Sequence, residues 1–160
     1  MIEYKHLEDA YKTLYECYND YQTNQDSKFI QYITDSCVKR FEYTLETAWK
    51  LAKKIFIQKY GKTESELTMN NIFRYMEGYE YTENWERWKN YHQKRNNTAH
   101  EYDFVKSRTL ISLIPDFLDD VKFFIDKLKK EQNVVVYGTI TDVGDIMGYR
   151  LKLDKIESAQ

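Results

Sequence analysis

The chain has few of the residues that interrupt or cross-link a fold. Its 160 residues include one proline, five glycines and two cysteines, whereas 42% are apolar and 31% are charged. This balance suits packed helices with solvated outer faces and argues against a disordered chain. Cys17 and Cys37 lie far apart without a CxxC spacing, so neither a disulfide framework nor a zinc site follows from them. We interpret both as buried thiols.

Long apolar runs and an excess of basic residues are missing as well. No uninterrupted stretch approaches the roughly 20 apolar residues that a membrane span requires, and the first residues lack the pattern of a secretory signal. We therefore predict a cytoplasmic protein without a membrane partner. A formal net charge of −2 excludes a globally basic protein that coats nucleic acid, so any contact with RNA must be local.

Apolar residues recur at spacings of three and four, which is the pattern of amphipathic helices. The segments that carry it are residues 4–21, 30–60, 68–77, 83 onward and 110–128. The pattern predicts an all-α protein, an antiparallel up-and-down bundle of four or five helices. We expect Gly61 to end the second helix as a left-handed cap, Thr68 to cap the third, and Pro115 to kink the last.

The length suits one domain with one continuous core. We predict that residues 1–131 form the bundle and that residues 132–160 are a C-terminal tail or hairpin, not a separate domain. The segments 134–140 and 149–153 are β-prone, which favours a small hairpin packed on the bundle, on a second copy or on a partner. A loosely ordered tail is the alternative.

One of the three histidines lies in a pattern that suits chemistry. His6 falls on a polar helix face and His92 follows an aromatic stretch, whereas His100 comes five residues after Arg95. Arginine offers a permanent positive fork that matches phosphate, and histidine moves protons near neutral pH. Acting on RNA, His100 would take the proton of a 2′-hydroxyl that attacks the adjacent phosphorus, while Arg95 stabilises the charge on the phosphate oxygens.

This chemistry needs no metal, and the sequence contains no HExxH, no clustered His/Cys ligands and no phosphate-binding glycine motif. We predict neither a metal nor a cofactor. Residues five apart on an ideal helix differ by about 140° in direction, so an unbroken helix cannot aim Arg95 and His100 at one point. A distortion at Asn96 and Asn97, or the juxtaposition of two protomers, would bring them together.

The charges near this pattern are mostly positive. The basic residues are Arg87, Lys89, Lys94, Arg95, Lys106 and Arg108, against Glu86, Glu101 and Asp103, which predicts a local positive field. Spacing alone also fits a structural role, in which Arg95 and His100 satisfy carbonyls or a carboxylate near a helix end. Helical spacing likewise makes most of the aromatic residues core rather than base-stacking surfaces.

Two separated motifs carry a resemblance to a known family. The segment 95–102, Arg-Asn-Asn-Thr-Ala-His-Glu-Tyr, resembles the signature of the HEPN superfamily in its HepT-like form, also called nucleotidyltransferase substrate-binding proteins. The segment 39–50, Lys-Arg-Phe-Glu-Tyr-Thr-Leu-Glu-Thr-Ala-Trp-Lys, is similar to the long-helix pattern of that branch, and Trp88 matches too. The resemblance covers roughly residues 4–130, and the tail from about Gln132 departs from it.

The resemblance implies a bundle of four or five helices, a homodimer, and a neighbouring gene for a minimal nucleotidyltransferase, with the pair often acting as toxin and antitoxin. It implies that Arg95 and His100 are catalytic residues of a metal-independent endoribonuclease and that Asn96 helps to position them. Tyr102 would be the residue that the partner adenylylates to silence the toxin, because added AMP places anionic bulk where the RNA phosphate must sit.

Two other functions remain open. The chain could be a non-catalytic subunit that binds the nucleotidyltransferase and presents its substrate, with a nucleotide or another anion in the same pocket. It could also be a purely structural dimerising bundle.

Overall fold

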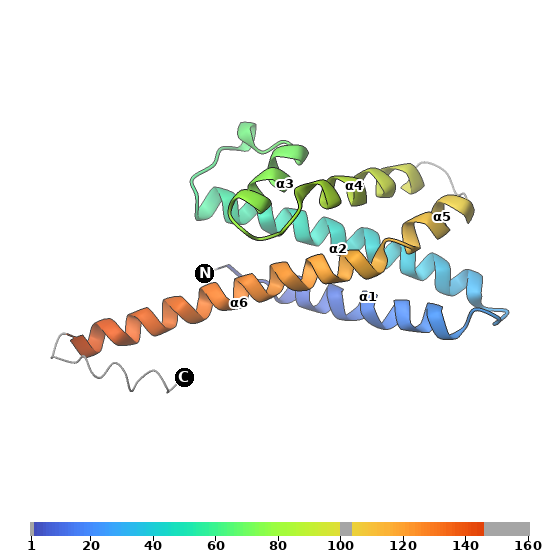
Figure 1. Ribbon diagram of the computed structural model, residues 1–160, viewed down its shortest axis with the longest axis horizontal. Coiled ribbons are helices and arrows are strands. Elements are labelled where there is room, and N and C mark those ends of the chain that lie inside the picture. The colour runs from blue at the N-terminus through green and yellow to red at the C-terminus, as the bar shows by residue number, and fades with distance from the viewer. Residues whose placement is uncertain (1, 100–103, 146–160) are drawn as a thin grey trace. The chain divides into compact units, whose positions relative to one another are not determined.

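A computed structural model describes residues 2–99 and 104–145, and this part of the chain consists of helices and their connections, without strands. The predicted all-α bundle is confirmed. The elements in chain order are α1 (Lys5–Thr23), α2 (Ile30–Gln58), the 3-10 turn η1 (Glu64–Glu66), α3 (Met69–Gly78), α4 (Trp85–Ala99), α5 (Phe104–Ile111) and α6 (Ile114–Asp145) (Figure 1).

The chain forms two compact units, residues 1–125 and residues 126–160, and α6 begins in the first and ends in the second. The aromatic core and Arg95 belong to the first unit, and residues 134–140 belong to the second.

Helices α1 and α2 form an antiparallel hairpin. Leu7, Leu14 and Cys17 recur on one face of α1 and are buried. The direction follows from two contacts: Thr44 Oγ1 donates to the carbonyl oxygen of Ala10 over 3.3 Å, and the sulfurs of Cys17 and Cys37 lie 2.9 Å apart. Later residues of α1 thus meet earlier residues of α2, as a short connection over residues 24–29 requires.

Both predicted cap residues are confirmed. Gly61 has a φ of +68°, in the left-handed region, and the N–H of Lys62 donates to the carbonyl of Phe56 over 2.9 Å, which closes the end of α2. Thr68 caps α3, since its side chain accepts a hydrogen bond from the N–H of Asn71. These ends are set by local chemistry, and they place α3 beside α4.

An aromatic core joins α2, α4 and the first turns of α6. The rings of Phe41 and Phe117 lie 4.6 Å apart, and the ring of Tyr91 meets Phe117 edge-on at 5.0 Å. Trp88 is fully buried, and its indole N–H donates to Thr82 Oγ1 over 2.9 Å. The core therefore fixes the middle of α4, the helix whose last turn carries Arg95.

The prediction of one kinked C-terminal helix is wrong, because the chain breaks it into α5 and α6. Ser112 and Leu113 lie between the two helices, and Pro115 falls in the first turn of α6. The first backbone N–H groups of a helix have no partner within it, so a proline there sacrifices no hydrogen bond. The carbonyl of Leu113 accepts the first bond of α6, from the N–H of Phe117 over 2.9 Å.

The predicted C-terminal hairpin is also corrected. Residues 134–140 are helical within α6 and do not form a strand, and residues 149–153 lie outside the described part of the chain. Strand propensity depends strongly on a pairing partner, whereas extending an existing helix adds a hydrogen bond for each residue fixed. The helix established upstream therefore continues through a β-prone segment.

Candidate functional site

Arg95 and Asn96 lie on the last turns of α4, as their place in the predicted motif requires. Both side chains are partly buried, and Arg95 Nη1 donates to Asn96 Oδ1 over 3.4 Å. The amide nitrogen of Asn96 in turn lies 3.3 Å from Nε2 of His92, one turn earlier. The structure thus orders a row of three polar side chains, His92, Asn96 and Arg95, along the end of α4.

His92 was not predicted to belong to the site. It comes four residues before Asn96, and residues four apart are neighbours on a helix, so this spacing could have indicated the contact. His92 lies outside the motif 95–102, however. The ring of Phe73 on α3 meets the imidazole at 6.1 Å. Burial, and then the positive charge of Arg95, lower the pKa of His92. A neutral imidazole with Nε2 unprotonated can accept the hydrogen bond of the Asn96 amide.

The positive charge of Arg95 also reaches α2. The pKa of Glu46 is lowered first by a hydrogen bond from Lys50, at 2.7 Å, and by the charges of Lys50 and Arg95. The guanidinium therefore acts within a polar surface shared by α2 and α4. An anion drawn to Arg95 would compete there with the carboxylate of Glu46.

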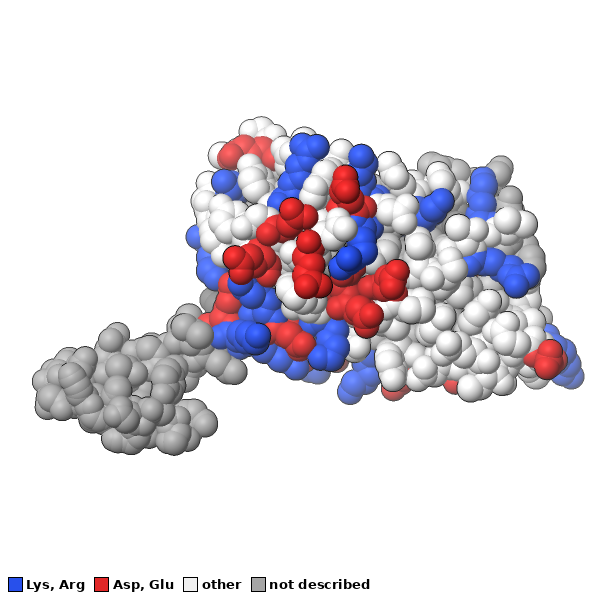
Figure 2. Space-filling model, viewed as in Figure 1, with Lys and Arg blue, Asp and Glu red and all other residues white. Residues whose placement is uncertain are grey.

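One residue of the predicted positive field is neutralised. Arg87 forms an ion pair with Asp120, whose carboxylate is buried, so its charge is satisfied inside the protein. Figure 2 shows lysine and arginine side chains interspersed with aspartate and glutamate on the face that it draws, without a uniform basic surface. The predicted field is weaker than the count of basic residues indicated.

His100 and Tyr102 lie outside the described residues, so their predicted roles remain predictions. Asn96 and Asn97 both belong to α4, which is helical through Ala99. The distortion expected at the two asparagines is therefore not found there. Ala99 is the last residue of α4 that the structure describes, so the angle between Arg95 and His100 stays a prediction. Juxtaposition of two protomers stays a prediction.

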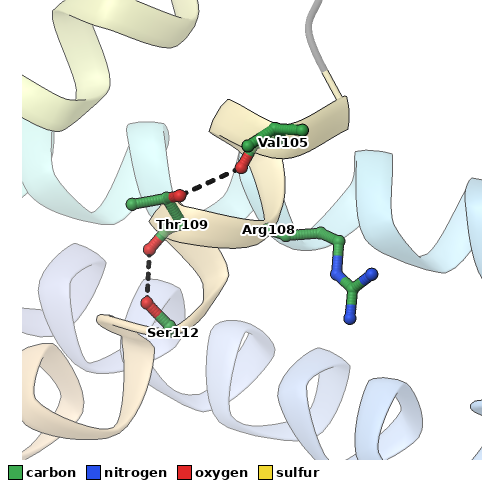
Figure 3. Close-up of a pocket in the computed structure, with 4 residues that line it drawn as sticks. All are labelled: Val105, Arg108, Thr109 and Ser112. Carbon is green, nitrogen blue, oxygen red and sulfur yellow. Dashed lines mark hydrogen bonds between the residues drawn. The ribbon is translucent and has the colours of Figure 1, made fainter.

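A shallow pocket of about 420 Å³ lies at α5 and is lined by Val105, Arg108, Thr109 and Ser112 (Figure 3). Its hydroxyls are engaged with the backbone: Thr109 donates to the carbonyl of Val105 and Ser112 to that of Thr109. The side chain of Arg108 extends away from both hydroxyls in Figure 3. The pocket does not assemble a catalytic set.

The described residues contain neither a metal-binding cluster nor a membrane-spanning helix. Among residues 2–99 and 104–145, no three His, Cys, Asp or Glu side chains are grouped so as to hold a metal ion. No helix in the same ranges combines the length and apolar character needed to cross a membrane.

Comparison with known proteins gives the family. Residues 2–130 match the family described as nucleotidyltransferase substrate binding protein like. The chain belongs to this family. The match includes Arg95, Asn96 and the segment 100–102, and it ends before the last 30 residues, 131–160.

The fold resembles that of HI0074 from Haemophilus influenzae, a protein described as having the fold of a substrate binding domain of a nucleotidyltransferase. The TM-score is 0.72 at 21% sequence identity, over 79% of this chain and 99% of that one. No curated protein matches the sequence. The structural similarity shows that the all-α fold of this chain has been observed in a solved structure.

Proposed function

We propose that this protein is a HepT-like HEPN toxin, a metal-independent endoribonuclease neutralised by a cognate minimal nucleotidyltransferase. One observation carries the proposal: Arg95 and Asn96 contact each other on α4, five and four residues before His100, in a chain of the nucleotidyltransferase substrate-binding family. The proposal includes a homodimer, because two protomers provide a second way of bringing Arg95 and His100 to one phosphate.

In the proposed reaction His100 accepts the proton of a ribose 2′-hydroxyl, and the 2′-oxygen attacks the adjacent phosphorus. The bond from phosphorus to the 5′-oxygen breaks, and the leaving oxygen takes up a proton. Arg95 stabilises the negative charge on the non-bridging oxygens, and Asn96 holds the guanidinium in place through the 3.4 Å contact. Adenylylation of Tyr102 would add anionic bulk beside this phosphate position and block RNA.

The test is electrophoresis of varied RNAs incubated with purified protein in EDTA, without the partner. Wild type is expected to cleave, and Arg95→Ala and His100→Ala are expected to lose cleavage while keeping the wild-type melting temperature. Lys54→Ala, at an exposed position of α2, is the matched control and should cleave as wild type. Intact RNA with folded wild-type protein would overturn the ribonuclease proposal.

A second candidate is a non-catalytic subunit that presents a substrate to the nucleotidyltransferase, and the name of the matched family favours it. The side chain of Arg95 would then bind a nucleotide or another anion. Nucleotide binding that depends on Arg95, without any cleavage of RNA, would select this function. If Arg95→Ala and His100→Ala only lower stability, a structural bundle is left.

A further inference from the structure

An open groove lies between helices α1 and α2, and the proposed RNA cleavage does not involve its residues. Its volume is about 350 Å³, and its polar and aromatic lining residues are His6, Asp9, Thr13, Lys39, Arg40 and Tyr43. The groove lies in the first compact unit, between residues of α1 and residues of α2. It combines two cations with an aromatic ring, a composition that the packing of the bundle does not require.

The balance of charge in the groove is positive. Its one carboxylate, Asp9, is paired with Lys5 outside the lining, at 3.1 Å. The Lys39 side chain is 83% exposed and meets Glu42 at 3.6 Å, a distance at which the pairing is weak. Arg40 donates through Nε to Ser36 Oγ, and its guanidinium carries further N–H donors at the two Nη atoms. These groups suit an anion such as a phosphate.

Tyr43 makes the groove suitable for a nucleotide rather than a bare anion. The residue is 58% exposed, whereas Phe41, two residues earlier, is fully buried. Tyr43 follows Arg40 by three residues and Lys39 by four, so on α2 its ring neighbours both cations. An exposed aromatic ring beside phosphate-binding cations matches a base stacked next to its own phosphate.

The groove is formed partly by α2, the helix that the charge of Arg95 also reaches at Glu46. Glu46 comes three residues after Tyr43 on α2. Its pKa is lowered mainly by the hydrogen bond from Lys50, and the charges of Lys50 and Arg95 lower it further. Lys39 and Glu46 are seven residues apart, so they point within about 20° of each other and lie roughly 10 Å apart along the helix. That span corresponds to one or two nucleotide steps of an extended strand.

We propose that the α1–α2 groove binds one nucleotide of a single-stranded RNA, with the phosphate on Arg40, Lys39 and His6 and the base on Tyr43. The choice of RNA over a free nucleotide rests on the proposed function, because a strand that occupies the groove continues along α2 toward Arg95. The groove then contributes to affinity and register, not to the chemical step.

The test is fluorescence anisotropy with a labelled 2′-O-methyl oligonucleotide, which lacks the attacking hydroxyl and cannot be cleaved. Arg40→Ala and Tyr43→Ala are expected to weaken binding at least about fivefold, the lower end of what one stacked base contributes. Arg40→Ala should also reduce the salt dependence by about one phosphate contact. Matched controls are Lys54→Ala and Tyr32→Ala, both at exposed positions of α2, which should bind as wild type.

The outcomes separate the groove from the catalytic proposal. Loss of binding in the groove variants supports the groove even if wild type cleaves no RNA, a result that would overturn only the ribonuclease. If Arg40→Ala and Tyr43→Ala both bind the oligonucleotide as wild type does, the proposal that the groove binds RNA is overturned, irrespective of the affinity of Arg95→Ala. Equal competition by AMP and by an unlabelled oligonucleotide would overturn the assignment to RNA and identify a mononucleotide site.

Discussion

Arg87 on α4 and Asp120 on α6 form a two-point ion pair that joins the two helices. Arg87 Nη2 meets Asp120 Oδ1 at 2.6 Å, and Nε meets Oδ2 at 2.9 Å. The hydroxyl of Tyr91 donates to the same Oδ2 over 2.6 Å. Burial is the main cause that raises the pKa of Tyr91, and the hydrogen bond to Asp120 is the second. The hydrogen bond to Asp120 also raises the pKa of Arg87. This network holds α4 one to two turns before Arg95.

Arg87→Ala is expected to destabilise the protein by about 3 kcal/mol, because it leaves the Asp120 carboxylate buried with one hydrogen bond. Tyr91→Phe, which keeps the ion pair, should cost only about 1 kcal/mol. Urea unfolding of both variants measures this, with Lys54→Ala as the surface control, expected within about 0.5 kcal/mol of wild type. Equal costs for Arg87→Ala and the control would show that the pair does not hold α4.

Cys17 and Cys37 are close enough to be cross-linked. Both thiols are free and buried, the sulfurs are 2.9 Å apart, and burial, with the contact to Cys17, raises the pKa of Cys37. A disulfide oxidant such as oxidised glutathione should join them slowly: the two thiols lose two protons and two electrons, and the oxidant takes these up and becomes two glutathione thiols. Mass spectrometry under denaturing conditions should find a loss of about 2 Da. Cys17→Ser must abolish that product; a stable glutathione adduct on wild type would contradict the geometry.

Gly61→Ala is expected to destabilise the protein by about 1 kcal/mol, because only the backbone conformation opposes a side chain there. The φ is +68°, and a Cβ at this position would meet no atom within 4 Å. Gly78 is the matched control: it lies in α3, has equal space and has no positive φ. Thermal unfolding should show Gly78→Ala neutral or stabilising. Identical shifts for both variants would contradict the left-handed cap.

Acidification should destabilise the protein partly through His92. Its pKa is lowered by burial and by Arg95, so below the unfolded value of ~6.5 the unfolded chain binds the proton more readily than the folded protein does. Stability is therefore lost as pH falls through that range. Urea unfolding at pH 7.5 and 5.5 should show a smaller difference for His92→Gln than for wild type. Arg95→Ala should fall between them, and an unchanged difference in His92→Gln would refute the assignment.

The places where the helices begin and end follow largely from neighbours along the chain. Apolar residues three and four apart select the buried face, and Gly61 and Thr68 close helix ends through bonds within a few residues. The break before α6 escaped this reasoning, because Pro115 fits a kink and a helix start equally well. The helical conformation of residues 134–140 was not predicted either, because the β-propensity of these residues takes no account of the helix that precedes them.

What the amino-acid sequence alone determined is therefore the all-α class, most helix bounds and the cap residues Gly61 and Thr68. Only the tertiary structure decided that Arg87 is neutralised by Asp120, that Cys17 meets Cys37, and that Phe73 from α3 covers His92. The reason is the range of the interactions. Contacts within one helix turn are fixed by spacing, whereas contacts between helices depend on how whole faces pack.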